Sequence, residues 1–466
     1  MVVWDEENVV HLLGRAGFGA KPSDVKKYLK MGQALTVEKL VGVKPSKAKG
    51  PSKPSNDKAE LKKLSTWWAK RMAKQNTRRL QEKMALFWHD HFASQFSVVK
   101  NVRRMAFQNR TFRRFGMGDM RTLVHEVTRD AAMLEFLDGK KNRKNNLNEN
   151  YGRELMELFV LGVFSFDGTE ENYSQTDVIE MARSTTGFQI DDKDIGFFNP
   201  ARFDDGSKTL FAGKPFQATG VLGVENVDGS GTLLPPATNI IDILFTHTDS
   251  AGNLTMPRFI GKKLWEYFAY PNPSAALIDD VTSDFRAGGA YVISDLLRSM
   301  LLHDEFYSPA AKSSSVKNPC EYVFSALRGL EAKSKHTETP GALAAMGMEL
   351  FEPPSVNGWN NGPAWLSTGQ TLSRFGVGQA IAAGRDKNIV LLKPEKIIPK
   401  NATTEDEVVD EILGRLGIAG TTPAGTRQAL IDYFEGQNDF ENPAVVETKV
   451  RGAIALALQL PEASLH

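Results

Sequence analysis

Ionisable residues concentrate in two stretches of the sequence whose residue types suit acid–base chemistry. Residues 82–92 end in two closely spaced histidines, and residues 148–159 carry three glutamates around one arginine. Histidine and glutamate serve as general acids and bases, and arginine holds anionic groups with a planar fork of donors. We therefore predict a polar enzyme pocket built from both stretches. Its predicted catalytic residues are His89, His91, Glu149, Glu154 and Glu157, and its predicted substrate-binding residues are Asn109, Arg110, Arg153, Lys141 and Arg143.

The same residues also have structural interpretations. On a regular helix His89 and His91 point in nearly opposite directions, so the two side chains cannot bind one metal ion together. His91 shares its helix face with apolar residues, which is typical of a histidine in the core. Glu149, Arg153 and Glu157 share one helix side at i, i+4 spacing, which is typical of an exposed series of salt bridges. We expect residues 82–92 to pack against residues 148–159.

The loop that precedes the second stretch is basic and rich in asparagine. Lys140, Lys141, Arg143 and Lys144 lead into the N-terminus of a helix expected over residues 148–162, whose dipole and unpaired N–H groups favour negative charge. We predict that an anionic small molecule or polymer binds at residues 139–147. Gly152 lies inside the expected helix and indicates that another backbone or a ligand comes close there.

Positive charge is also concentrated nearer the N-terminus. Residues 44–114 contain 19 Lys or Arg against 4 Asp or Glu. This excess favours a non-catalytic binding or scaffold module for an anionic polymer or a protein partner, which is our alternative to the enzyme. A solvated helix face is the simpler explanation. Nucleic acid is disfavoured because basic and aromatic residues do not alternate as in proteins that bind single strands.

Several common enzyme signatures are missing from the sequence. His125-Glu126 begins like a zinc-protease motif, but Arg129 stands where the second histidine belongs. The sequence contains no dinucleotide-binding fingerprint, phosphate-binding loop of the Walker type or serine elbow. We predict no cofactor and no metal ligands; a divalent transition metal stays an alternative, although the expected helices contain no Glu-x-x-His pair.

The elements that must position these residues are mainly helices. The chain has 466 residues, of which 41% are hydrophobic and 24% charged, and 57 basic residues balance 56 acidic ones. Apolar residues recur mostly at helical spacing, so we predict a mainly α fold. The expected parts are an N-terminal helical segment (1–43), a basic Pro/Ser linker (44–55), a helical core (56–186) that starts with one long helix to about residue 91, a glycine-rich insertion with short strands (187–235), the rest of the helical core (236–392) and an acidic C-terminal helical block (393–466).

The N-terminus, the length of the apolar runs and the single cysteine bear on localisation and redox state. The sequence as written begins without a secretion signal and contains no apolar run long enough to cross a bilayer, so we expect a cytoplasmic protein, or an exported one if the N-terminus has been trimmed. The lone Cys320 is expected to be a buried apolar residue. The sequence does not indicate an oligomeric state.

A series of short motifs resembles the bacterial family known as domain of unknown function 1800. The motifs are His11-Leu12-Leu13-Gly14-Arg15-Ala16-Gly17-Phe18-Gly19, Lys83-Met84 with Phe87-Trp88-His89-Asp90-His91-Phe92, Gln108-Asn109-Arg110, the segment from Asn148 to Phe159, Thr185-Thr186-Gly187-Phe188, Arg258-Phe259-Ile260 with Lys263-Leu264-Trp265, and Val356-Asn357-Gly358-Trp359 with Trp365-Leu366. The resemblance spans residues 11–382 and leaves the last block outside.

The family resemblance implies a mostly helical bacterial protein without an established activity. Members are often exported and encoded beside a family that resembles sulfatase-type enzymes, which implies an extracellular or envelope polymer, such as a carbohydrate, as the substrate of the predicted enzyme. Two positions depart from the family pattern: Asp90 stands where members usually have Asn, and Asn360-Asn361 replaces the usual Pro-Gly.

Overall fold

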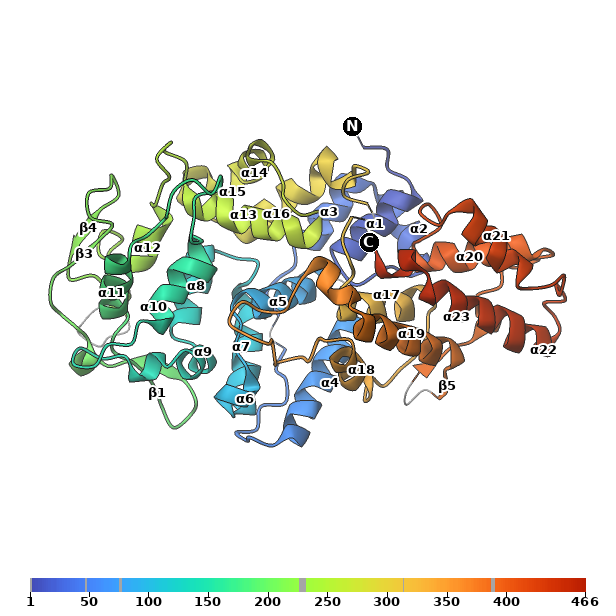
Figure 1. Ribbon diagram of the computed structural model, residues 1–466, viewed down its shortest axis with the longest axis horizontal. Coiled ribbons are helices and arrows are strands. Elements are labelled where there is room, and N and C mark those ends of the chain that lie inside the picture. The colour runs from blue at the N-terminus through green and yellow to red at the C-terminus, as the bar shows by residue number, and fades with distance from the viewer. Residues whose placement is uncertain (1, 47, 75–77, 226–231, 313, 387–389) are drawn as a thin grey trace.

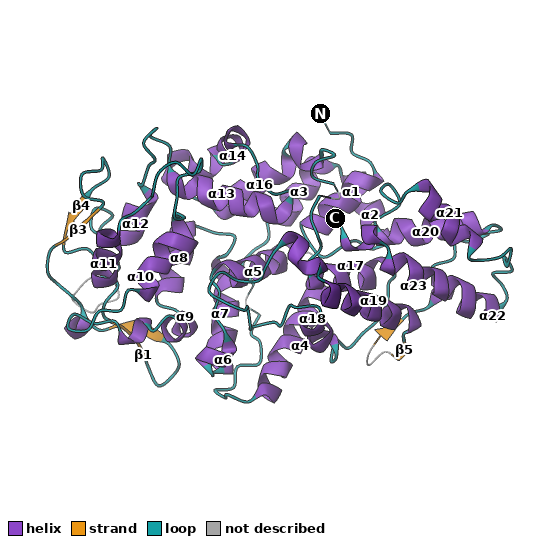
Figure 2. Cartoon of the chain, in the orientation of Figure 1, coloured by secondary structure: helices purple, strands orange, loops and turns teal. Residues whose placement is uncertain are grey.

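The computed structural model describes residues 1–466 except 1, 47, 75–77, 226–231, 313 and 387–389. Helices form nearly all of the regular structure in the described part of the chain, and the short strands lie at the periphery (Figure 2). The predicted mainly α fold is therefore confirmed. Among the described residues, no helix is both long and apolar enough to cross a membrane.

The first part of the chain, through residue 184, contains eleven α-helices among the described residues. They are α1 (Glu6–Arg15), α2 (Pro22–Met31), α3 (Gln33–Val41), α4 (Lys58–Lys74), α5 (Arg79–His91), α6 (Phe96–Val99), α7 (Val102–Phe115), α8 (Met120–Thr128), α9 (Ala131–Phe136), α10 (Asn150–Glu154) and α11 (Gln175–Ser184). The expected single helix over residues 56–91 is wrong, because α4 and α5 are separate helices. Arg78, directly before α5, lies outside both helices, and residues 75–77 lie outside the described part.

The later helices follow the glycine-rich insertion. They are α12 (Ile240–Phe245), α13 (Thr255–Phe268), α14 (Ala275–Val281), α15 (Ser283–Arg286), α16 (Ile293–Leu302), α17 (Pro319–Gly329), α18 (Thr339–Ala345), α19 (Thr368–Ala383), α20 (Glu405–Leu416), α21 (Ala424–Asp432), α22 (Pro443–Val445) and α23 (Arg451–Gln459). Short 3-10 or π-helical segments are η1 (Gly139–Lys141), η2 (Leu155–Val160), η3 (Pro200–Arg202), η4 (Ala287–Gly289), η5 (Asp304–Tyr307), η6 (Gly362–Leu366), η7 (Pro394–Lys396), η8 (Val446–Val450) and η9 (Pro461–Ser464).

The described strands form three antiparallel two-stranded sheets. β1 (Phe188–Ile190) pairs with β2 (Gly196–Phe198), β3 (Lys208–Leu210) with β4 (Ala218–Gly220), and β5 (Arg385–Asp386) with β6 (Val390–Leu391). The first two sheets lie within residues 187–235, so the expected partly β insertion is confirmed. β1 runs beside η1 and thereby brings the insertion next to the basic loop at residues 139–147.

One hydrophobic core joins distant parts of the chain. Its buried side chains run from Leu12 in α1 to Ala463 in η9. The C-terminal block packs on the rest of the molecule, since α23 lies along α19, and α20 contacts α17 (Figure 1). Cys320 is fully buried within this core, as expected.

Two local features control the position of the second ionisable stretch. The expected helix over residues 148–162 is only partly α-helical, because α10 ends at Glu154 and the backbone widens into the π-helix η2. A Cβ atom on Gly152 would lie 2.9 Å from the backbone nitrogen of Ala182, so α10 and α11 are in direct backbone contact. The prediction of a close approach at Gly152 is therefore confirmed, and the neighbour is a helix backbone.

Candidate functional site

His89 is enclosed by aromatic rings near the end of α5. Its ring lies 5.5 Å from that of Trp68, 5.3 Å from Phe351 and 5.4 Å from Trp359. Neither ring nitrogen has a hydrogen-bond partner among the described residues. Burial lowers the pKa of His89 to about 3, so the imidazole is neutral at physiological pH. A neutral ring in a closed apolar environment has the characteristics of a core residue.

His91 is also buried, and it joins α5 to η2. Its Nε2 atom lies 3.0 Å from the carbonyl oxygen of Phe159, and the rings of Phe92 and Phe159 are 5.1 Å apart. The expected packing of residues 82–92 against 148–159 is therefore confirmed. Burial, with a further contribution from the positive charge of Lys263, lowers the pKa of His91 to about 3.

Asp90, between the two histidines, contacts a motif that is distant in sequence. Its Oδ1 atom accepts a hydrogen bond of 2.6 Å from the backbone N–H of Trp359. Gly358 has a φ of +82°, and a Cβ atom there would lie 2.3 Å from Asp90 Oδ1. Burial raises the pKa of Asp90 to about 7. The segment around Gly358 therefore packs directly over the end of α5.

The predicted residues of α10 and η2 lie near the surface and form two pairs. Glu149 and Arg153 form a salt bridge of 3.0 Å, and both side chains are hydrogen-bonded to the side chain of Gln175. Glu157 accepts a 2.9 Å hydrogen bond from the hydroxyl of Tyr173. These contacts fit the structural interpretation of this stretch as a series of surface interactions.

Glu154 and the two predicted residues of α7 have different surroundings. Partial burial, together with the negative charge of Glu157, raises the pKa of Glu154. Asn109 is 1% exposed, and its Oδ1 atom accepts a 2.6 Å hydrogen bond from Arg113. Arg110 lies over the ring of Phe107 at 4.6 Å. Neither contact directs the α7 side chains toward the glutamates.

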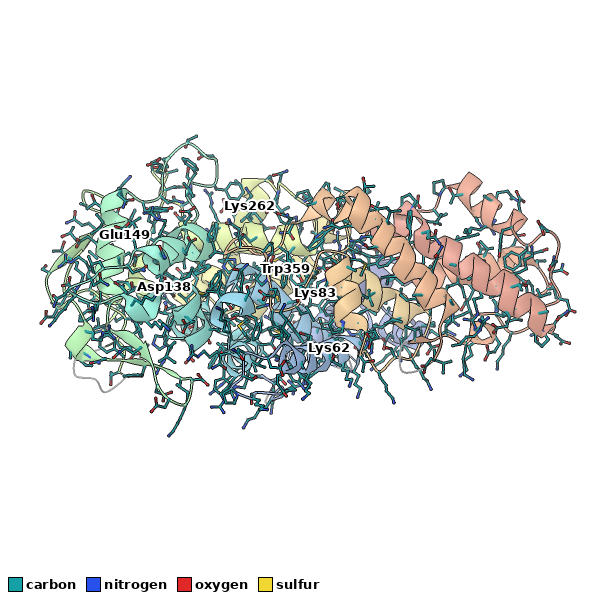
Figure 3. The ribbon with its side chains drawn as sticks, turned by 60° about the horizontal axis from the view of Figure 1, so that its bottom comes forward. Lys62, Lys83, Asp138, Glu149, Lys262 and Trp359 are labelled. Atoms are coloured by element: carbon teal, nitrogen blue, oxygen red, sulfur yellow. The ribbon has the colours of Figure 1, made fainter. Side chains whose placement is uncertain are left out.

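The structure does not gather the ten predicted site residues into one pocket. Figure 3 shows Asp138 and Glu149 toward one end of the molecule, away from Trp359 beside the end of α5. The physical reason is that the histidines are enclosed by aromatic side chains, whereas Glu149 and Glu157 lie near the surface and bind Arg153 and Tyr173 there. The catalytic roles assigned to His89, His91, Glu149, Glu154 and Glu157 stay predictions.

A basic pocket does form at the predicted anion-binding loop. It is a cavity of about 430 Å³ between α7, η1, the following loop, β1 and η3. We call it the basic pocket, and its lining residues are Arg104, Lys140, Lys141, Arg143, Asn146, Gln189, Ile190 and Arg202. Five of these eight side chains are cations, and two of them, Lys141 and Arg143, are predicted binding residues.

A buried asparagine fixes the backbone that carries these cations. Asn142 is 2% exposed, and its Nδ2 atom donates a 2.7 Å hydrogen bond to the carbonyl oxygen of Ala182. Its Oδ1 atom accepts a 3.0 Å hydrogen bond from the backbone N–H of Asn148. The N–H of Lys144 donates to the carbonyl oxygen of Arg202, which ties the loop to η3. The pocket is thus held by hydrogen bonds from both sides.

Acidic residues neutralise only part of the pocket. Glu135 pairs with Arg104 at 2.6 Å and with Lys140 at 2.7 Å, and Asp138 pairs with Lys141 at 2.7 Å. The side chains of Arg143 and Arg202 form no ion pair or hydrogen bond with any residue that the structure describes.

Sequence reasoning missed Arg104 and Arg202 as members of this pocket. They lie far from the loop in the sequence, and only the folding of α7 and η3 against it brings them close. The helix after the loop was expected to favour an anion through its dipole. This contribution is smaller than predicted, because α10 has only five residues before the backbone widens. Glu149, just before α10, pairs with Arg153 and with no loop cation that the structure describes.

The basic residues of 44–114 do not form one free surface. Arg79, Lys83 and Arg113 are buried and pair with Asp24, Glu321 and Glu82, respectively. Part of the local charge excess is therefore used inside the protein. No cluster of three or more His, Cys, Asp or Glu side chains suited to a metal ion occurs in the described part of the chain.

Comparison with protein families agrees with the motif series. The family described as "Protein of unknown function (DUF1800)" matches residues 11–465. Because this match covers nearly the whole chain, the protein belongs to that family. The match continues through the C-terminal block, so the expectation that this block falls outside the family is wrong. No curated protein and no solved structure matches the chain.

Proposed function

We propose that this protein binds anionic groups, such as phosphate, sulfate or carboxylate, at the basic pocket. The observation that carries the proposal is that Arg143 and Arg202 line a cavity of about 430 Å³ without acidic partners among the described residues. Guanidinium groups bind oxyanions through paired N–H donors, and such charge-assisted bonds are stronger than neutral ones. The ligand is either a small anion or the charged group of a polymer.

The pocket's preformed backbone supports this proposal. Asn142 and the bond from Lys144 to Arg202 fix the loop before a ligand arrives, so binding does not have to order it. The remaining cations, Arg104, Lys140 and Lys141, keep the local potential positive although each has an acidic partner.

Replacement of both unpaired arginines tests the function. In wild-type protein, phosphate, sulfate or a sulfated oligosaccharide should raise the melting temperature, and added sodium chloride should reduce the shift. The double variant Arg143→Ala/Arg202→Ala should bind at least about tenfold more weakly by isothermal titration calorimetry, since two charge-assisted contacts are lost. Its melting temperature without ligand should be nearly unchanged, because these side chains have no partners to lose.

A matched control uses two exposed lysines of the other basic region. Lys62 and Lys63 lie on α4 and form surface ion pairs. The variant Lys62→Ala/Lys63→Ala should keep the full ligand effect. If this control lost the effect and the arginine variant kept it, the anion would bind on the 44–114 region and the proposal for the basic pocket would be wrong.

A further inference from the structure

A second cavity lies behind the glycine-rich N-terminal segment. It has a volume of about 420 Å³ and is bounded by α1, α2, α17, the end of α20, and residues 465–466. These elements surround the C-terminal end of the described chain in Figure 1. Gly19 has a φ of +89°, and a Cβ atom there would lie 2.7 Å from the Cα atom of Ser325. The N-terminal segment therefore passes directly over α17 and closes one wall of this cavity, which we call the α1–α17 cavity.

Buried charges surround the inner wall of the α1–α17 cavity. Glu321 is 5% exposed and lies at the start of α17. One of its oxygens pairs with Lys83, and the other accepts a hydrogen bond of 2.7 Å from the backbone N–H of Asn318 and lies 3.0 Å from Nε2 of His466. Both carboxylate oxygens are thus already used by the protein itself.

The buried cations outnumber this carboxylate. Arg15 donates to Ser315 Oγ and to two backbone carbonyl oxygens, and Arg374 donates to the carbonyl oxygens of Trp365 and Lys317. Both guanidinium groups are therefore engaged by the fold. Carbonyl oxygens carry only partial charge, so the positive charge of these groups is not cancelled by an acid.

Lys317 is the buried cation that lines the cavity and keeps unused donors. It is 6% exposed, and its Nζ atom donates one hydrogen bond of 3.1 Å, to the carbonyl oxygen of Ala463. A protonated amine has three donors, so two are not used by the described residues. Burial lowers the pKa of Lys317 to about 8, with an opposing contribution from the charge of Glu321 and smaller lowering contributions from those of Arg15 and Arg374. The amine is protonated at neutral pH.

The rest of the cavity wall has an apolar part and a set of charged residues, and it has open space next to α1; the charged residues are Glu6, Glu7, Lys21, Lys26, Lys312, Glu411 and Arg415. The apolar wall includes Val10, Phe18, Val25, Ile418 and Leu465. A Cβ atom on Gly14 would meet only the ring of His466, at 3.9 Å. The α1–α17 cavity thus combines a cationic end with an apolar body.

We propose that the α1–α17 cavity binds a small organic carboxylate with an apolar body, whose carboxylate accepts hydrogen bonds from the amine of Lys317. One negative charge fits better than two, because Glu321 lies in the same wall and repels a more highly charged group. The apolar side chains favour a ligand with a hydrocarbon portion over an inorganic anion. This site is separate from the basic pocket and does not depend on the function proposed there.

The test compares octanoate with two probes that each lack one of its features. Isothermal titration calorimetry of the full chain carrying Arg143→Ala/Arg202→Ala, which lacks the anion contacts of the basic pocket, should show binding of octanoate and little or no binding of octanol or inorganic phosphate. The variant Lys317→Met should weaken octanoate at least about tenfold, whereas Lys317→Arg should retain most of the affinity, because a guanidinium keeps the charge and the donors. Affinity should fall about tenfold for each pH unit above about 8, as the amine loses its proton.

A second variant keeps the proposal testable if Lys317→Met does not fold. Gly14→Leu adds a side chain into open space and should block octanoate while the free protein stays folded. The variant Lys62→Met changes an exposed lysine of α4 that lines neither cavity and should leave octanoate binding unchanged. The proposal would be overturned by unchanged octanoate binding in Lys317→Met or, where that variant does not fold, in Gly14→Leu, by absence of octanoate binding in wild type, or by phosphate binding that depends on Lys317.

Discussion

Helix α5 buries ionisable side chains at both of its ends, and the two ends stabilise them differently. Near the N-terminal end, Lys83 is 1% exposed and keeps its charge by pairing with Glu321. Near the C-terminal end, His89 and His91 are neutral because burial lowers the pKa of each to about 3. The first end lies beside the α1–α17 cavity, whereas the second is enclosed by aromatic rings.

This difference shows why a motif rich in ionisable residues is not by itself a site. Charged groups can remain buried only when an opposite charge or several hydrogen bonds compensate the loss of water. Where no partner is present, the group becomes neutral and packs like an apolar residue. The end that retains charge is therefore the end where a ligand of complementary charge gains most.

The largest effect is expected when the charged end loses its carboxylate. Glu321→Gln should lower the free energy of unfolding by about 3–5 kcal/mol, because it leaves the ammonium of Lys83 buried without an opposite charge. Glutamine can still accept the helix-capping hydrogen bond from the N–H of Asn318, so the change tests the charge alone. Urea denaturation at pH 7 measures the difference.

The matched control removes a carboxylate from an exposed pair. Asp138→Asn breaks the ion pair with Lys141, whose side chain is 61% exposed. Its urea denaturation midpoint should be close to that of wild type, because water compensates both charges. Similar losses of stability in both variants would contradict the distinction between buried and exposed charge.

A smaller, pH-dependent effect is expected at the neutral end. Burial raises the pKa of Asp90 to about 7, so the folded state favours the protonated carboxyl. The associated stability is fully present below the unfolded pKa, near 4, and is lost as the pH rises toward 7. Asp90→Asn should remove this loss and be more stable than wild type by roughly 2–4 kcal/mol at pH 8. An asparagine Oδ1 can still accept from the N–H of Trp359.

Urea denaturation of both proteins across pH 4 to 8 checks the sign of this effect. The stability difference between Asp90→Asn and wild type should grow with pH and level off above about 7. A difference that is constant over the whole range would show that the carboxyl group titrates normally.

Much of the helical fold could be predicted from the sequence because helices follow local rules. Apolar spacing predicted the helical class, and Pro319 at the first position of α17 fits the strong start of that helix, where Asn318 and Glu321 form a capping box. The separation of α4 from α5 and the π-helical form of η2 were not predicted. Phe159 of η2 contacts His91 at the end of α5, a partner far away in the sequence that no local rule predicts.

The candidate sites were less predictable than the fold. The basic loop was visible in the sequence because its cations are adjacent, and the structure places Lys141 and Arg143 in one pocket. Arg202 and the cavity-lining Lys317 were not identified, since each acts through partners far away in the sequence. Spacing along one helix predicts which side chains share a face, but it does not predict which face borders a cavity.

The smallest effect is expected from the same substitution at the two histidines of α5. His91→Phe removes the hydrogen bond to the carbonyl oxygen of Phe159 and should cost about 1 kcal/mol. His89→Phe removes two ring nitrogens without partners among the described residues, so stability should be unchanged or rise by up to about 1 kcal/mol. Because both changes enlarge the ring equally, the difference between the variants isolates the hydrogen bond.

Acid denaturation extends the comparison of the two histidines. The pKa of each is about 3 when folded and near 6.5 when unfolded, so the stability that each neutral ring contributes is present above pH 6.5 and is lost as the pH falls toward 3. Each phenylalanine variant should therefore lose less stability than wild type between pH 6.5 and 4, as measured by urea denaturation at each pH. If His89→Phe kept the full acid sensitivity of wild type, the pKa of His89 would not be lowered by folding, and an acid–base role for this end of α5 would regain support over the packing role.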